Sequence, residues 1–506
     1  MNRRDFLYQL SFLTGGATVA MSGIPLRAFA HPLVPDAATA NGKIIVLLQL
    51  NGGNDGLNTV IPFRNDIYYQ KRPTIAIRRE NTIALNDEIG LHPSMRLLKN
   101  LYDKGQVSIV QNVGYDNPNR SHFRSTDIWL SGSDANEFLY DGWTGRYLAQ
   151  AFPEFPGKFP EHPMAIQLGA VESMLLQSQW GSMGVVFDSP SAFYQLVSGS
   201  RADSDPPPPT IAGEELRFLK GIAAQSIQYA NVIKAAADKA QNQVTYPNTN
   251  IGRQLAIIAE LIGGGLQTSV YLATLGGFDT HAGQLPLHAN LLTQFSEAVA
   301  AFQADLEKLG VAEKVVLMTF SEFGRRLNEN GSAGTDHGTA APLFVIGKSV
   351  RGGIYGDAPA LNDLDNVGDI KFRYDYRQIY TAVLRDHLGL TNADIKKVLE
   401  QRDFNALPIF KRNTPPLAAD VLFELYTNAP NPFSESTTIA YKLAKSMDIR
   451  LRVYDLQGHV VAVLHEGIQD AGMHEIRMER AGMAAGVYLC ALEAEGQRAV
   501  KKMLAL

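Results

Sequence analysis

Runs of consecutive apolar residues alternate with helix-like segments from about residue 43 to residue 400. Runs that are apolar at nearly every position predict strands covered on both faces, as in parallel sheets. They lie at residues 43–50, 107–113, 163–169 and 341–347, and at the starts of SVYLATLGGFDTH and KVVLMTFSEFGRR. Helical periodicity is found at residues 91–104, 285–310 and 374–390, and two further helices are expected between 213 and 266. The alternation predicts an α/β fold with a central, mostly parallel sheet flanked by helices.

The pattern changes after residue 420, where short segments of alternating polar and apolar residues follow one another, separated by turn residues. This pattern predicts a small all-β sandwich over residues 421–506. A proline-containing stretch at residues 401–420 is expected to be the linker to the α/β domain at 43–400. A second stiff connector is expected at SDPPPPT, residues 204–210.

The first 30 residues form a separate segment with the features of an export signal. Arg3 and Arg4 precede an apolar stretch, and Ala28-Phe29-Ala30 resembles a cleavage site. These features predict a twin-arginine signal peptide, with an uncleaved membrane anchor as the alternative. No other run approaches the roughly 20 apolar residues that a spanning helix needs. The net charge of -5 gives no reason to expect nucleic-acid binding, and the single cysteine, Cys490, lies in a strand pattern that predicts a core position.

Side chains able to bind metal or attack an ester follow several of the predicted strands. They are Asp55 in LLQLNGGNDGLNTVIP, Ser121 in NRSHFRSTDIW, Asp279 and His281 in GGFDTHAGQ, and Glu322, Asp336 and His337 in FSEFGRRLNENGSAGTDHGTAAP. Because the carboxyl ends of parallel strands meet at one edge of a sheet, we expect these residues to converge. Carboxylates and imidazoles are ligands for zinc, manganese or iron, and oxygen-rich sites also take calcium.

Each of these residues also has an ordinary structural interpretation. Asp55 could cap a turn, and Ser121 could be a plain helix N-cap. Glu322 could pair with Arg325 or Arg326. A serine at a helix N-terminus beside a bound cation is, however, a suitable arrangement for metal-assisted ester hydrolysis.

The segments LQLNGGNDGLNTVIP, SHFRSTDIWLSG, GGFDTHAGQ, SEFGRRLNENGSAGTDHGTAAP and GGIYGDAP resemble the DUF1501 family of the alkaline phosphatase–sulfatase superfamily, over about residues 43–395. The resemblance implies a central sheet flanked by helices and two metal sites around a nucleophile. It matches Asp55 to the first acidic ligand, places the nucleophile within one residue of Ser121, with Ser125 as the second choice, and pairs Asp279 with His281.

This chain departs from the superfamily pattern at the next strand. That strand ends in Ser321-Glu322 instead of an Asp-His pair, and Asp336-His337 comes later. The resemblance therefore implies that Glu322 replaces a usual ligand and that His337 serves as the late histidine. The Cys-x-Pro-x-Arg motif of formylglycine sulfatases is absent from the sequence.

The C-terminal segments NAPNPFSESTTIAYKL, LRVYDLQGHVV, AGMAAGVYLCAL and KKMLAL resemble the sorting domains of the type IX secretion system. The resemblance implies passage through the periplasm and across the outer membrane to the cell surface or the medium. The partners that it implies are the twin-arginine and type IX export machineries.

Two functions follow as predictions. The first is an exported hydrolase of phosphate esters, with sulfate esters as the second choice, acting on small or polymer-borne substrates. Ser121 would attack, Arg120 or Arg325 would steady the anion, and the carboxylates and histidines named above would hold a divalent metal, zinc first and manganese or calcium next. The alternative is a non-catalytic, surface-displayed binding protein that retains the fold.

Overall fold

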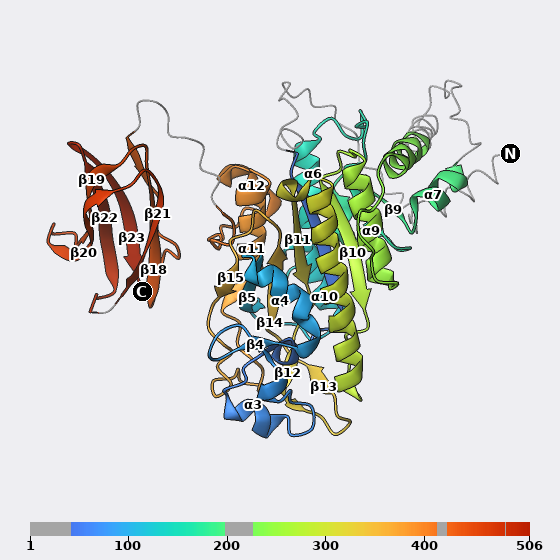
Figure 1. Cartoon of the computed structure of the whole chain (residues 1–506), viewed down its shortest axis with the longest axis horizontal. Coiled ribbons are helices and arrows are strands. Elements are labelled where there is room, and N and C mark those ends of the chain that lie inside the picture. Colours follow the sequence, from blue (N-terminus) through green and yellow to red (C-terminus); the bar gives the residue numbers. More distant parts are fainter. Residues whose placement is uncertain (1–41, 198–225, 412–421, 481) are drawn as a thin grey trace. The chain divides into compact units, whose positions relative to one another are not determined.

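The computed structural model describes residues 42–197, 226–411, 422–480 and 482–506 (Figure 1). The predicted signal peptide and the connector at 204–210 lie outside these residues, as does most of the predicted linker's second half. The chain divides into two compact units, one ending at Asp403 and the other spanning Phe404–Leu506. Within the described residues, no helix is both long enough and apolar enough to span a bilayer.

A nine-stranded sheet forms the centre of the first unit and confirms the predicted α/β class. The strand order is β15-β5-β14-β11-β1-β10-β6-β9, and β16 pairs with β5. Strand β14 runs antiparallel to both of its neighbours, and the other pairs are parallel. The strands are β1 (Ile44–Asn51), β5 (Val107–Gly114), β6 (Ala165–Leu168), β9 (Gly184–Phe187), β10 (Val270–Gly276), β11 (Val315–Phe320), β14 (Ala341–Ile346), β15 (Gly353–Tyr355) and β16 (Tyr374–Asp375).

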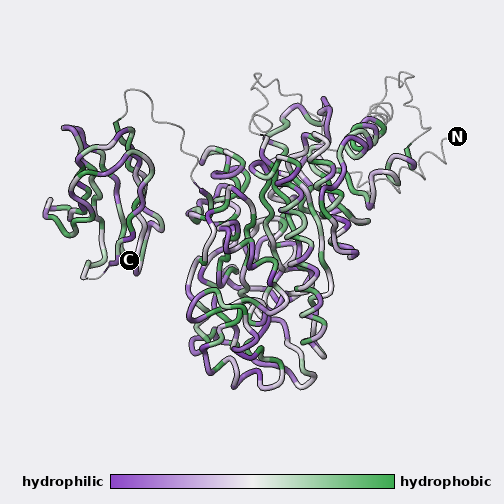
Figure 2. Tube along the Cα trace, in the orientation of Figure 1, coloured by the Kyte–Doolittle hydropathy of each residue, from purple (hydrophilic) through white to green (hydrophobic). Residues whose placement is uncertain are grey.

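Helices supply the rest of the core. The long helix α10 (Gln284–Lys308) packs against α4 (Arg96–Asp103) and α9 (Asn250–Gly263), and their apolar side chains join those of β1 in one buried cluster. Helices α5 (His122–Ser131), α6 (Trp143–Ala151) and α11 (Tyr376–Ala382) meet through aromatic rings, with Trp129 4.6 Å from Tyr376 and Trp143 4.5 Å from Tyr380. Figure 2 shows apolar residues gathered along the sheet and these helices.

Short elements complete this unit. Directly after β1 come α2 (Gly56–Thr59), β2 (Val60–Ile61) and α3 (Asp66–Lys71), and directly after β11 comes a hairpin of β12 (Arg325–Glu329) and β13 (Thr335–His337). The remaining elements are β3 (Ile83–Ala84), β4 (Gly90–Leu91), β7 (Gln177–Ser178), β8 (Gly181–Ser182), α7 (Pro190–Val197), α12 (Asn392–Val398), a π-helical turn at Val383–His387, and 3₁₀ turns at Arg79–Asn81, Pro93–Met95, Met174–Leu176 and Ala312–Lys314.

The second unit is all-β, as predicted. One sheet has the order β17-β18-β21 and the other β20-β19-β22-β23. Cys490 is buried in their shared core, and burial raises the pKa of its thiol to about 12, which confirms it as a core residue. The strands are β17 (Phe423–Leu425), β18 (Ser436–Leu443), β19 (Met447–Tyr454), β20 (Val460–Gln469), β21 (Gly472–Glu479), β22 (Gly486–Ala494) and β23 (Gln497–Ala505).

A chain that ends near Pro415 is expected to keep the α/β unit folded. The reason is that the two units have separate apolar cores and divide at Asp403. Tryptophan fluorescence checks this directly, because the three tryptophans, Trp129, Trp143 and Trp180, all precede the cut. In a host with a type IX system the truncated protein should accumulate in the periplasm. Unfolding of the α/β unit, or appearance of the truncated chain in the medium, would contradict the prediction.

Candidate metal centre

The loops that follow β1, β10 and β11 touch one another at the carboxyl end of the sheet. Gly52 has φ +120°, and a Cβ at this position would lie 2.4 Å from the backbone nitrogen of Asp279. The Gly52 N–H also donates a hydrogen bond of 2.9 Å to Glu322 after β11. Glycine is therefore required after β1, because only it permits this backbone conformation and this close approach.

Three side chains meet where these loops join the N-terminus of α5. His122, Asp279 and His337 each offer a ligand atom, and these atoms all lie within 4.8 Å of one another. His281 borders the same point, since its Nε2 lies 3.0 Å from Asp279 Oδ1 and 3.0 Å from His337 Nε2. The predicted convergence of Asp279, His281 and His337 is thus present in the structure.

Three histidines, His122, His281 and His337, turn the same ring nitrogen, Nε2, toward Asp279. Nδ1 of His122 lies 2.7 Å from Glu322 Oε1, Nδ1 of His337 lies 2.8 Å from the Arg120 carbonyl, and Nδ1 of His281 lies 3.4 Å from Asp336 Oδ1. Because a carboxylate or carbonyl oxygen only accepts, Nδ1 carries the proton in the neutral ring. Nε2 then keeps its lone pair for a metal, as is usual for metal-binding histidines.

The charge states of the cluster also suit a cation. Burial acts to raise the pKa of Asp279, but the interactions that oppose burial, led by the hydrogen bond from Arg325, lower the pKa to about 2. Burial lowers the pKa of His337. Among the described residues, the buried Nε2 of His122 has no hydrogen-bond partner. An orphaned imidazole nitrogen beside an ionised carboxylate and two further imidazoles fits a divalent metal.

Ser121 is the N-cap residue of α5 and directly precedes His122. It is exposed, and its hydroxyl makes no capping hydrogen bond to the helix. Ser121 is therefore the immediate neighbour in sequence of one member of the cluster. Ser125, the second choice, is buried, and its hydroxyl contacts the Tyr115 hydroxyl at 2.7 Å and the Glu322 carbonyl. This geometry favours Ser121 over Ser125 as a nucleophile.

Asp55 does not join the cluster, which differs from the prediction that it binds metal. It caps α2 through the Leu57 N–H, and its other oxygen accepts from Arg72 at 2.6 Å and from Gln284. Asp55 and Arg72 have no exposed side-chain surface. A carboxylate that follows a strand can thus serve as a buried helix cap and ion-pair partner, which is the other interpretation of its position.

The predicted anion-binding arginines are engaged elsewhere. Arg325 is 1% exposed and donates to the carbonyls of Gly53 and Thr335 and to Asp279. Arg120 pairs with Asp369 and lies 3.7 Å from Asp365. The Arg325 guanidinium is thus buried among protein oxygens, whereas the Arg120 side chain, 31% exposed, is held in an ion pair. Glu322 and Asp336 contact the outer nitrogens, Nδ1, of His122 and His281, and neither belongs to the group of His122, Asp279 and His337.

Sequence reasoning missed His122 as a candidate ligand. The signal was present, because His122 follows the candidate nucleophile at the start of a helix that comes after a strand. Glu322 was a second indication, since a carboxylate near a strand end is a common hydrogen-bond partner for a metal-binding histidine.

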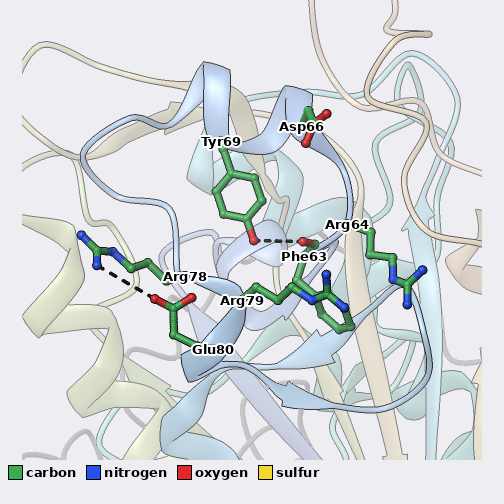
Figure 3. A pocket seen from close by; sticks show the side chains of 7 residues that line it. All are labelled: Phe63, Arg64, Asp66, Tyr69, Arg78, Arg79 and Glu80. Atoms are coloured by element: carbon green, nitrogen blue, oxygen red, sulfur yellow. Dashed lines mark hydrogen bonds and ion pairs between the residues drawn. The ribbon is translucent and has the colours of Figure 1, made fainter.

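A surface cavity of about 440 Å³ shares no residue with the metal cluster (Figure 3). The residues that line the cavity interact with one another. The Tyr69 hydroxyl donates to the Phe63 carbonyl at 3.0 Å, Arg79 lies over the Phe63 ring, and Arg78 lies 3.9 Å from Glu80. The cavity therefore adds nothing to the assignment of the metal centre. Its lining residues are Phe63, Arg64, Asp66, Tyr69, Arg78, Arg79 and Glu80.

Two buried histidines near Asp55 predict a loss of stability in acid. Burial lowers the pKa of His92 to about 4 and that of His288 to about 3, against 6.5 for a free histidine. Between pH 6.5 and 4 the unfolded chain binds more protons, so the free energy of unfolding falls as pH falls. Each histidine contributes about 1.4 kcal/mol per pH unit.

Urea titrations of the chelator-treated protein at pH 7, 6 and 5 measure this slope without interference from metal release. His288→Gln should remove one histidine's share of the slope, whatever it does to the stability itself. If His288→Gln leaves the pH dependence of the free energy of unfolding unchanged, His288 is not one of its causes.

The comparisons with known proteins agree with the two-part organisation. Residues 223–400 match the family model described as a protein of unknown function (DUF1501). Residues 428–505 match a secretion system C-terminal sorting domain. The sorting domain indicates export to the cell surface or secretion, as the sequence predicted, and interaction with the type IX machinery. Asp279, His281 and His337 lie within the DUF1501 match, whereas Ser121 and His122 precede it.

The solved structures to which the chain is similar have low sequence identity to it. An alkaline phosphatase superfamily protein from Vibrio parahaemolyticus is 9% identical, with 88% of this chain and 85% of that chain covered and a TM-score of 0.34. A sulfatase from Pseudoalteromonas sp. is 10% identical, with 87% and 84% covered and a TM-score of 0.32. PorZ, a type IX secretion component of Porphyromonas gingivalis, is 17% identical over 16% of this chain and 11% of its own, with a TM-score of 0.13. No curated protein matches the chain.

Proposed function

We propose that this protein is an exported, metal-dependent hydrolase of phosphate esters in which Ser121 is the nucleophile. The observation that carries the proposal is the set of three histidines that turn Nε2 toward Asp279, with an exposed serine next in sequence to one of them. The orphaned Nε2 of His122 supports a metal at this point. Zinc suits a ligand set of imidazoles with one carboxylate best.

The chain's own residues would divide the work as follows. His122, His281, His337 and Asp279 would hold the metal, while Glu322, Asp336 and the Arg120 carbonyl keep the imidazoles oriented. When bound, the metal would stabilise negative charge on the attacking oxygen and on the ester. The Ser121 hydroxyl would attack phosphorus and release the alcohol, and water would then cleave the phosphoserine.

The N-terminus of α5 would replace the arginines as the anion-binding element. This helix has 10 residues, and the Ser121 side chain leaves its first N–H groups uncapped. Free N–H groups and the helix dipole attract phosphate and sulfate alike, so the proposal keeps phosphate esters first and sulfate esters second.

The test combines metal content with hydrolysis by the exported full chain. The protein should contain metal and hydrolyse a nitrophenyl phosphate monoester or diester. Ser121→Ala should lower kcat by about 10³-fold or more while the metal content stays the same. Ser191→Ala, which changes an exposed serine on α7, is the matched control and should be silent. Bound metal with no activity on phosphate or sulfate esters would instead support a surface-displayed binding protein.

A further inference from the structure

Arg325 occupies a cage of oxygen atoms beside the proposed metal ligands. Its Nε donates to the Gly53 carbonyl at 2.7 Å, and its Nη1 donates to the Thr335 carbonyl at 2.8 Å. Its Nη2 contacts the carbonyls of Gly52 and Phe278 and lies 2.7 Å from Asp279 Oδ1. Four carbonyl oxygens and one carboxylate oxygen are the kind of surroundings that a hard divalent cation prefers. Here a guanidinium fills them.

We infer that the centre holds one divalent cation and that the buried guanidinium of Arg325 stands in the place of a second. The inference rests on the proposed metal-dependent function and goes beyond it, because it fixes the number of metal ions. It also gives Arg325 a role as a fixed positive charge that positions Asp279, in place of substrate binding.

The second acidic group that could have held another cation is already neutralised. Asp55 has no exposed surface, and its oxygens accept from Arg72, Gln284 and the Leu57 N–H. Arg72 is itself held by the carbonyls of Leu327 and Arg326, at 2.9 Å and 2.7 Å. A metal ion at Asp55 would have to expel a buried arginine from all of these contacts, leaving its charge unpaired.

The charges around Asp279 also indicate that the centre holds one divalent cation. One oxygen of Asp279, Oδ1, accepts a hydrogen bond from Arg325 and also lies 3.0 to 3.5 Å from the Nε2 atoms of the three histidines. The histidines are neutral when they act as ligands, and Asp279, the carboxylate that their Nε2 atoms approach, already balances the fixed positive charge of Arg325. A second divalent cation would add two positive charges beside Arg325, while the neighbouring carboxylates Glu322 and Asp336 already face Nδ1 of His122 and Nδ1 of His281.

The experiment is a count of metal ions per chain, made by elemental analysis and by titrating the chelator-treated full chain with Co²⁺ while recording its absorption bands. We expect one equivalent and a single titration end point. Asp55→Asn should still bind one equivalent, because Asp55 takes no part in the centre. The wild-type titration decides the matter on its own if Asp55→Asn fails to fold.

Two equivalents in the wild type, one of them lost in Asp55→Asn, would overturn this inference and leave the proposed hydrolase intact. No metal at all would overturn both. A further variant, Arg325→Gln, should open the oxygen cage and raise the Co²⁺ capacity above one equivalent, whereas Arg325→Lys, which keeps the charge, should not. An unchanged capacity in a folded Arg325→Gln protein would remove Arg325 from the role of a second cation.

Discussion

Asp279→Asn is expected to empty the metal centre and to lower hydrolysis by about 10³-fold or more. The reason is geometric, since Asp279 Oδ1 is the oxygen that all three histidine Nε2 atoms approach, at 3.0 to 3.5 Å. An asparagine keeps the size of the side chain and removes the negative charge. The measurement is competition for metal between the protein and a coloured chelator, followed by activity at saturating metal.

Asp336→Asn is the matched control for this prediction. Asp336 faces the outer nitrogen of His281 and is exposed, so its loss should weaken metal binding by about 10- to 100-fold without abolishing it. The expected order of metal affinity is therefore wild type, Asp336→Asn, Asp279→Asn. If Asp279→Asn binds metal as tightly as the wild type, the ion sits elsewhere and the proposed ligand set is wrong.

Arg72→Met should cause the largest loss of stability among single changes outside the metal centre. The change leaves the charge of Asp55 buried without its partner, and it removes the donors to the carbonyls of Leu327 and Arg326. Breaking one side of a buried ion pair costs about 3–5 kcal/mol. Urea unfolding followed by tryptophan fluorescence measures the effect on the α/β unit alone.

Lys99→Met provides a comparison in which methionine likewise replaces the cation of an ion pair, but at the surface. Lys99 pairs with Asp103 one helical turn away, with the Asp103 side chain 56% exposed. Such exposed pairs are worth about 0–1 kcal/mol, so this variant should unfold close to the wild type. Similar losses in the two variants would mean that the Asp55–Arg72 pair has no special role in holding α2 and α3 to the hairpin.

The strands of the central sheet were predictable because each is apolar over nearly its whole length. The direction of β14 was not, since a fully buried antiparallel strand has the same apolar pattern as a parallel one. Residues 341–346 therefore read like the other strands, and only the tertiary pairing with β5 and β11 shows the reversal.

The site was predictable in part for a similar reason. Position after a strand identified Asp279, His281 and His337, because parallel strand ends do converge. The same rule grouped Asp55 with them, but the structure places Asp55 as a buried helix cap paired with Arg72, and such a cap also follows a strand. Whether an arginine such as Arg325 faces a substrate or its own backbone depends on which carbonyls surround it, and those come from three segments that are far apart in the sequence.

The position of β1 at the centre of the sheet has a consequence for the order of folding. Its partners come much later in the chain, because Ile45 pairs with Val270 on one side and with Val316 on the other. Contacts so distant in sequence close slowly, since the loop entropy is lost before the pairing is gained. The loops that carry Asp279 and Glu322 follow those same late strands. Capacity to bind metal should therefore appear only in the slowest phase of refolding, together with the closure of the sheet around β1.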